Sequence, residues 1–130
     1  MSKGTVLVVD DDAAIRDLVQ LALDDEGYTV SVWGNGATLP QAQARQADLI
    51  LLDLSLVEAA RGATVERLRA DPATAYIPLI GFSARADGAA LAARMQLDDL
   101  LAKPFDLDDF FALVARWVAE GRHRRATAPC

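Results

Sequence analysis

The stretches VLVVDDD (residues 6–12) and LILLD (residues 49–53) decide the fold, because each is a short aliphatic run that stops at aspartate. Such runs are too short for a buried helix and lack the polar alternation of a half-exposed strand. They are typical of strands that are covered on both faces, as in a parallel sheet. The acids then follow the carboxyl ends of two strands, which is the edge where open α/β sheets bind ligands.

Three further strands and five helices are predicted around these two runs. The strands are residues 28–33 (YTVSVW), 77–83 (IPLIGFS) and 100–102. A turn is predicted at residues 34–36 (GNG), directly after the first of these. Helical spacing of apolar residues predicts a first helix with Ile15, Leu18, Val19 and Ala22 on its buried face, ending near Gly27. Further helices are expected at 39–45 with Pro40 in the first turn, through 65–69, at 89–95, and after a capping pair at Asp106 and Asp109. The buried face of the last helix is expected to hold Leu107, Phe110, Phe111, Val114, Trp117 and Val118. Strands that alternate with helices predict an α/β fold with a parallel sheet and helices on both faces.

The length of 130 residues fits one domain, which we expect to span residues 1–121. The basic residues near the end predict a flexible basic tail at residues 122–130. The net charge is −6, and the only basic run lies within the last ten residues. This balance argues against nucleic-acid contact by the body of the domain, because such contact needs a basic face.

The chain has one cysteine, Cys130, and one histidine, His123. An internal disulfide is therefore impossible, and a reducing cytoplasm is the expected compartment. One histidine excludes metal sites that need two and a Ser-His-Asp arrangement in the body. No apolar run approaches the roughly 18 residues that a membrane span requires, so no membrane contact is expected.

Polar side chains follow four of the predicted strands. Asp10 and Asp11 follow the first, Asp53 the third, Ser83 the fourth and Lys103 the fifth. If the first and third strands are neighbours where the winding reverses, all five residues converge on one crevice. Carboxylates gathered there repel one another, and a hard cation would relieve the repulsion.

The set of residues has a chemical logic. Oxygen ligands from Asp10, Asp11 and Asp53, with the backbone carbonyl of Ser55, would suit Mg²⁺ or the similar Mn²⁺. A carboxylate can attack phosphorus if the charge on the transferring group is neutralised. The cation and Lys103 would supply that neutralisation, and the Ser83 hydroxyl would donate to a phosphoryl oxygen.

From about residue 5 to residue 120 the chain resembles a response-regulator receiver domain of two-component signalling, of the CheY-like superfamily. The corresponding positions are the acidic pair Asp10 and Asp11, the phosphoacceptor Asp53, the hydroxyl residue Ser83 followed by Ala84, and Lys103-Pro104-Phe105. Each is weak evidence alone, but in this order at the ends of core strands they are strong evidence.

The resemblance implies a doubly wound, flavodoxin-like sheet of five parallel strands in the order 2-1-3-4-5. It also implies phosphorylation of Asp53 by a phosphohistidine on a sensor kinase or phosphotransfer protein. The domain would then be a signalling switch in a phosphorelay that regulates an output partner, with at most slow self-dephosphorylation. Ser83, the Ala84 backbone and Lys103 would bind the phosphate, and Pro104 is a candidate for a cis peptide bond.

The chain departs from the family pattern in three places. Residues 54–62 (LSLVEAARG) lack the usual proline and have a displaced glycine, which predicts a reshaped loop with its helix starting early. Leu100 replaces the aromatic residue that usually couples the switch to the output face. Gln96-Leu97 replaces a common Gly-Ala, which predicts an unusual fourth helix.

Two other functions fit the same residues. A pseudo-receiver would keep the fold as an interaction module without phosphorylation, and the altered loop and Leu100 favour it. A Mg²⁺-dependent phosphatase with an aspartate nucleophile normally has a second acid two residues later, where this chain has Ser55. The phosphorylatable receiver is favoured because all its reactive residue types are present. The sequence leaves the kinase, the output and any continuation of the chain open.

Overall fold

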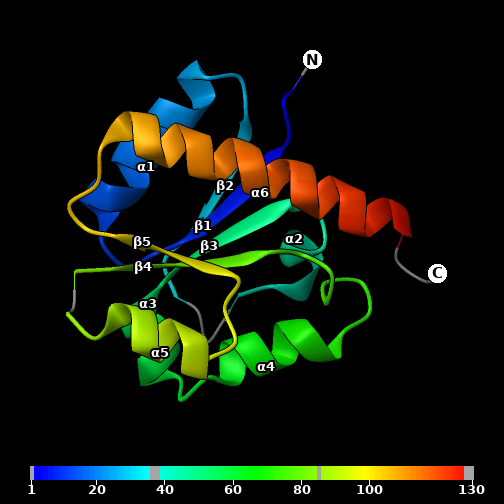
Figure 1. The fold of residues 1–130 in the computed structure, drawn as a ribbon. Helices are drawn as coiled ribbons and strands as arrows, with labels where there is room; N and C mark the ends of the chain where they lie inside the picture. Colours follow the sequence, from blue (N-terminus) through cyan, green and yellow to red (C-terminus); the bar gives the residue numbers. More distant parts are fainter. Residues whose placement is uncertain (1, 36–38, 85, 128–130) are drawn as a thin grey trace.

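A parallel sheet between two layers of helices forms the protein (Figure 1). The computed structural model describes residues 2–35, 39–84 and 86–127. The strands are β1 (Thr5–Val9), β2 (Thr29–Trp33), β3 (Leu49–Asp53), β4 (Leu79–Ser83) and β5 (Asp99–Ala102). The helices are α1 (Ala13–Asp25), α2 (Gln41–Ala44), α3 (Leu54–Ala59), α4 (Ala63–Ala70), α5 (Gly88–Arg94) and α6 (Leu107–Thr127).

The five strands pair in the order β2-β1-β3-β4-β5, and every pairing is parallel. This is the flavodoxin-like topology, so the expected strand order is confirmed. The winding reverses between β1 and β3, which are direct neighbours with Val9 opposite Leu52. The carboxyl ends of these two strands therefore open side by side into one crevice.

Alternate residues of each central strand enter different cores, which explains why the strands read as continuous apolar runs. In β1, Val6 and Val8 face one helix layer, while Leu7 and Val9 face the other. Figure 1 shows α1 and α6 over one face of the sheet and α3, α4 and α5 over the other. Because both faces are covered, the sheet positions its carboxyl ends rigidly.

The apolar faces of the first and last helices differ in part from the prediction. Val19 and Leu23 are the buried residues of α1, whereas Leu18 is 49% exposed. At the start of α6, Leu107 is 45% exposed although we assigned it to the buried stripe. Helical spacing gives the direction of a face to within about one residue, and both leucines lie at the margin of that face.

Two element boundaries were also predicted too wide. The helix expected at 39–45 is the short α2, with Pro40 at its N-cap rather than in its first turn. The strand expected at 77–83 begins at Leu79, although Ile77 is fully buried just before it. The predicted turn at 34–36 reaches residue 36, which lies outside the described residues.

The region after Asp53 holds a helix that the pattern of five strands and five helices did not include. α3 starts at Leu54, directly after β3, and buries Leu54 and Val57. The expectation of a reshaped loop with an early helix is therefore confirmed. Gly62, which separates α3 from α4, has φ +78°, a conformation that favours glycine.

The predicted flexible tail is wrong for residues 122–127, because α6 continues to Thr127. Arg124 donates a hydrogen bond to Asp98 at 3.1 Å, and Arg125 donates one to the carbonyl of Ala47 at 3.1 Å. These contacts attach the last turns of α6 to the domain. Residues 128–130, including Cys130, lie outside the described residues. Among the described helices, none is both long and apolar enough to cross a membrane.

Candidate functional site

Four neighbouring strand ends bring the predicted polar residues to one edge of the sheet. Asp10 directly follows β1, Asp53 is the last residue of β3, Ser83 is the last residue of β4, and Lys103 directly follows β5. The carboxyl ends of parallel strands share one edge, so the strand order alone gathers these side chains.

Asp10, Asp11 and Asp53 form an acid cluster in which one carboxylate oxygen of each lies within 4.8 Å of the others. Asp10 is fully buried and Asp53 is only 8% exposed, while Asp11 is open to solvent. Carboxylates this close repel one another, and burial strengthens the repulsion because little water screens it. The geometry therefore favours a cation between them.

Lys103 brings a positive charge to the acid cluster. Its Nζ lies 3.4 Å from Asp10 Oδ2 and 5.6 Å from the centre of the Phe82 ring. The side chain is thus directed inward over the edge of the sheet, as predicted. The Lys103–Pro104 peptide bond is cis, as the prediction for Pro104 required.

Asp53 carries the clearest electrostatic perturbation in the cluster. Burial raises the pKa of the Asp53 carboxyl, and the charges of Asp10 and Asp11 raise it further. The Ser55 N–H and the Lys103 charge act in the opposite direction, but they do not offset the rise. The ionised form of Asp53 is therefore held at a free-energy cost, which a cation or a covalent modification would relieve.

Asp53 also caps the helix that follows it. Its Oδ1 accepts the backbone N–H of Ser55 at 3.0 Å, which makes Asp53 the N-cap of α3. Ser55 consequently lies in the first turn of α3, where a carbonyl points along the helix toward its C-terminus. A Ser55 carbonyl that follows this helical direction points away from the acid cluster, and its role as a metal ligand stays a prediction.

Ser83 and Ala84 lie at the opposite side of Asp53 from β1. Ser83 is buried, and its backbone carbonyl accepts the Lys103 N–H at 2.7 Å, which joins the ends of β4 and β5. Ala84 is exposed directly after it. A Cβ added at Gly88 would lie 3.1 Å from Ser83 Oγ, so the start of α5 packs closely on the hydroxyl.

The three carboxylates fit a hard divalent cation. Mg²⁺ takes oxygen ligands and commonly combines one or two carboxylates with water and phosphate oxygens. The cluster offers oxygens from a buried, a nearly buried and an exposed carboxylate, so one side of a bound ion would stay open to water. Asp12, by contrast, caps α1 by accepting the Ala14 N–H at 2.9 Å, and it stands outside the cluster.

Arg16 is a residue beside the site that the sequence analysis missed. Its Nη1 donates a hydrogen bond of 2.7 Å to the backbone carbonyl of Asp10. The available signal was an arginine in the first turns of a helix that starts immediately after a run of acids. That signal is weak because most arginines at such positions are solvated.

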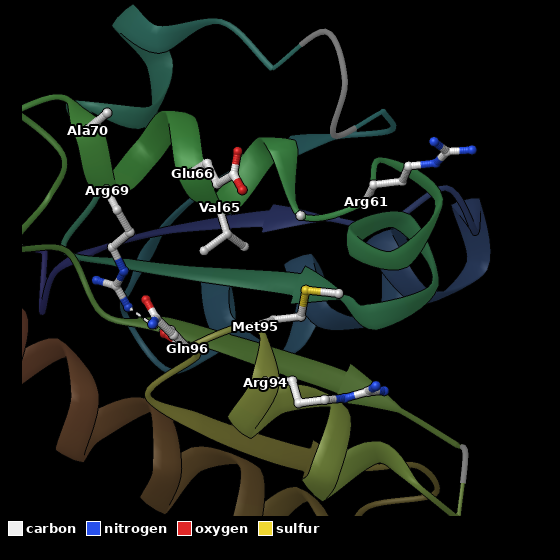
Figure 2. Close-up of a pocket in the computed structure, with 9 residues that line it drawn as sticks. Arg61, Val65, Glu66, Arg69, Ala70, Arg94, Met95 and Gln96 are labelled. Carbon is white, nitrogen blue, oxygen red and sulfur yellow. Dashed lines mark hydrogen bonds between the residues drawn. The ribbon is translucent and has the colours of Figure 1, made fainter.

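A separate cavity of about 490 Å³ lies between α4 and α5 and shares no residue with the acid cluster (Figure 2). Arg61 and Arg94 stand on opposite sides of it, with Met95 between them. Arg69 crosses its inner end and donates hydrogen bonds to the Gln96 carbonyl and to Asp98. Arg61 and Gln96 have φ of +54° and +59° where α3 and α5 end. The cavity therefore lies beside the residues at which α3 and α5 end.

Comparison with known proteins agrees with the arrangement of strands and acids. Residues 6–115 match the family described as the response regulator receiver domain. The chain is 38% identical over 116 residues to RpaA, a DNA-binding dual master transcriptional regulator of Synechocystis sp.. It is 33% identical over 127 residues to NtrC, a DNA-binding transcriptional regulator of Rhizobium meliloti.

These alignments cover 84% and 95% of this chain but only 46% of RpaA and 26% of NtrC. The chain thus spans less than half of either relative. Among solved structures, the receiver domain of the sensor histidine kinase PA1611 of Pseudomonas aeruginosa, which has a magnesium ion coordinated in its active site cleft, superimposes with a TM-score of 0.77. That match has 24% sequence identity and covers 89% of this chain and 98% of the other, and it shows a shared fold.

Proposed function

The chain belongs to the response-regulator receiver domain family, and on that premise we propose that it accepts a phosphoryl group on Asp53 and thereby switches a partner. The donor is a phosphohistidine on a sensor kinase or a phosphotransfer protein. The observation that carries the proposal is the acid cluster, in which the nearly buried Asp53 lies beside Asp10 and Asp11.

The reaction transfers one phosphoryl group between two side chains. A carboxylate oxygen of Asp53 attacks phosphorus, the new O–P bond forms as the P–N bond to the donor imidazole breaks, and the imidazole keeps the electron pair. When bound, Mg²⁺ supplies positive charge against both the carboxylates and the incoming phosphoryl oxygens. Asp10 and Asp11 would hold that ion together with Asp53.

Lys103 and Ser83 would then hold the product. The Lys103 ammonium, now 3.4 Å from Asp10 Oδ2, can exchange part of that contact for a phosphoryl oxygen on Asp53. The Ser83 hydroxyl and the Ala84 N–H are donors at the neighbouring strand end. Movement of these groups toward Asp53 biases the loops after β3 and β4 between two arrangements, which constitutes the switch.

The proposal also predicts the kind of activity. Asp53 is consumed as an acceptor rather than regenerated as a catalyst, so the domain is a signalling module with at most slow hydrolysis of its own acyl phosphate. RpaA and NtrC are DNA-binding regulators, and we propose that the output of this receiver is likewise a separate domain or protein. We expect the exchange to take place in the cytoplasm, which is consistent with the family of response regulators.

The test is phosphorylation of the purified chain by a small donor. Acetyl phosphate with Mg²⁺ should add one phosphoryl group, detected as a mass increase of the intact protein under non-basic conditions, because acyl phosphates hydrolyse in base. Asp53→Asn should gain no mass, and the control Asp12→Asn should gain as much as the parent. Mass added to Asp53→Asn would move the acceptor elsewhere.

The same measurement separates the receiver from a pseudo-receiver. The early start of α3 favours the pseudo-receiver, since a carbonyl in the first turn of a helix would point away from the acid cluster. A parent protein that binds Mg²⁺ but gains no mass would be an interaction module of the same fold.

A further inference from the structure

Asp10 is the most completely restrained residue of the acid cluster. Its N–H donates to the Trp33 carbonyl at 3.1 Å, and its Oδ1 accepts the Asp12 N–H at 2.9 Å. Its Oδ2 lies 3.4 Å from Lys103 Nζ, and its backbone carbonyl accepts the 2.7 Å bond from Arg16. Every polar atom of this fully buried residue therefore has a partner. Two of the partners, Lys103 and Arg16, are charged, and of these only Arg16 binds the backbone of Asp10.

Arg16 reaches Asp10 from α1 across the end of the sheet. The residue is half-buried, and its own N–H donates to the Asp12 carbonyl at 3.1 Å within the first turn. A charged donor to a carbonyl forms a stronger bond than a neutral donor does. The segment of residues 10–12 is thus held at both ends. Arg16 binds the carbonyl of Asp10, and the Asp12 side chain caps the start of α1.

Gly34 leaves the space that the guanidinium occupies. A Cβ added at Gly34 would lie 3.1 Å from Arg16 Nη1 and 3.6 Å from its Cζ. Most real Cβ atoms keep a larger distance, so a methyl group there would require the guanidinium to shift by a few tenths of an ångström, which would disturb its bond to the Asp10 carbonyl. Gly34 directly follows β2, and the short contact therefore links the ends of three elements at one point.

Arg16 forms no ion pair with any carboxylate of the described residues, although several acids are nearby. Its charge acts on the cluster only through space, whereas its hydrogen bond acts on the position of Asp10. These two effects have opposite signs for a bound cation. A nearby positive charge weakens cation binding, while a fixed carboxylate strengthens it.

We propose that Arg16 is a positioning residue of the cation site, whose bond to the Asp10 carbonyl fixes the direction of the Asp10 carboxylate. This inference rests on the proposed function, because it assumes that the acid cluster binds Mg²⁺. Groups that orient metal ligands without touching the metal commonly change metal affinity by about 10-fold or more when they are removed. Positioning is therefore the larger of the two effects of Arg16.

The test is a calorimetric titration of the folded chain with Mg²⁺. Arg16→Gln should raise the Mg²⁺ Kd by about tenfold, although loss of a positive charge alone would lower it. Arg16→Lys keeps the charge and one reaching donor, and should recover part of the affinity. Arg45→Gln, which removes an exposed arginine paired with Asp71 on another part of the chain, is the matched control and should leave Kd unchanged.

Gly34→Ala separates position from charge, because it displaces the guanidinium without removing it. We expect a several-fold rise in Kd from Gly34→Ala and no further rise when it is added to Arg16→Gln, since both changes act on one bond. Circular dichroism checks folding, and if Arg16→Gln does not fold, Gly34→Ala and Arg16→Lys decide.

An unchanged or lower Kd in Arg16→Gln, or a Gly34→Ala protein that binds like the parent, would overturn the role of Arg16 alone. A parent protein that binds no Mg²⁺ would overturn the proposed function together with it.

Discussion

Asp53 combines a reactive position with an unfavourable charge. It is the last residue of a fully buried strand, and the charges of Asp10 and Asp11 lie beside it. The fold therefore loses stability to keep this carboxylate ionised at the edge of the sheet. That loss can be measured without any phosphorylation.

Asp53→Asn should stabilise the metal-free domain at neutral pH by on the order of 1 kcal/mol, because it removes a buried charge that its neighbours repel. The folded-state pKa of Asp53 is raised, so the folded protein binds the proton more tightly than the unfolded chain does. Between the ordinary pKa and the raised one, the stability of the parent falls as pH rises. The cost is fully present above the raised pKa and absent below the ordinary one.

Chemical denaturation of both proteins at several pH values measures this difference. The gain from Asp53→Asn should shrink as the pH is lowered through the folded-state pKa. Asp17→Asn, which removes an exposed carboxylate from α1, should show no comparable gain. A gain for Asp53→Asn that did not depend on pH would mean that charge is not its cause.

The residues of the site were predictable because their identity and their positions at strand ends are both local properties. Asp10, Asp11, Asp53, Ser83 and Lys103 each follow or end a run of core residues, and the structure brings them to one edge. Arg16 and Gly34 were not predictable in the same way. Their contact joins a helix to a neighbouring strand end, and no local pattern encodes that distance.

The long helix α6 shows how tertiary contacts decide the end of an element. Basic residues near a chain end predict a solvated tail, but Asp98 and the carbonyl of Ala47 accept hydrogen bonds from Arg124 and Arg125. Trp117 supports the same surface by donating from its indole N–H to Asp99 at 3.0 Å. These acceptors lie far from α6 in the sequence, so the position at which the helix ends could not be predicted from the residues of the helix itself.

Gly121 allows α6 to pass close to the start of β3. A Cβ there would overlap the backbone carbonyl oxygen of Asp48. Gly121→Ala should therefore lower the melting temperature, with an overpacking cost of about 1–3 kcal/mol that exceeds the roughly 1 kcal/mol gain in helix propensity. The measurement is thermal unfolding followed by circular dichroism.

The sign of the Gly121→Ala effect tests the position of α6. A higher melting temperature would mean that only the better helix propensity of alanine acts. This turn of α6 would then not approach Asp48 closely. Introducing glycine at the exposed Ala115 is the control, and it should destabilise the helix by about the propensity difference only.

The short helix α3 was only partly predictable. The absence of proline after Asp53 indicated a reshaped loop, and alanine and leucine in residues 54–60 are compatible with a helix. Its length and its cap depend on the Asp53 side chain, which the sequence analysis had assigned to a different role. The sequence pattern indicated that Asp53 lies at a strand end beside other acids, but it did not indicate that the same side chain caps α3.

At the scale of the whole molecule, the acid cluster should link cation binding to stability. Mg²⁺ at about five times its Kd should add roughly 1 kcal/mol to the free energy of unfolding, if it binds only the folded state. For a domain of this size, the melting temperature should rise by a few degrees. Differential scanning calorimetry with and without Mg²⁺ measures the shift.

Asp11→Asn and Asp53→Asn should lose this stabilisation by Mg²⁺. Asp12→Asn should keep it, because Asp12 caps α1 outside the cluster and asparagine is also a good N-cap residue. Equal stabilisation of all four proteins would place Mg²⁺ at a site other than the acid cluster.

The global fold was predictable because several levels of pattern agree. Short apolar runs gave the parallel sheet, and the alternation of strands and helices gave the layers. The exposed Leu18 and Leu107 were placed wrongly, since the width of a buried helix face depends on how neighbouring elements cover it. The strand order was implied by the resemblance and is now observed.

The N-cap bond at Asp53 makes the two oxygens of that carboxylate chemically different. Oδ1 is shared with the first turn of α3, through the Ser55 N–H. An acyl phosphate formed at the other oxygen would leave the hydrogen bond to this turn intact, whereas one formed at Oδ1 would weaken it, because an oxygen bonded to phosphorus is a poorer acceptor. Which oxygen of Asp53 carries the phosphoryl group would therefore decide whether the first turn of α3 unwinds as part of the conformational change.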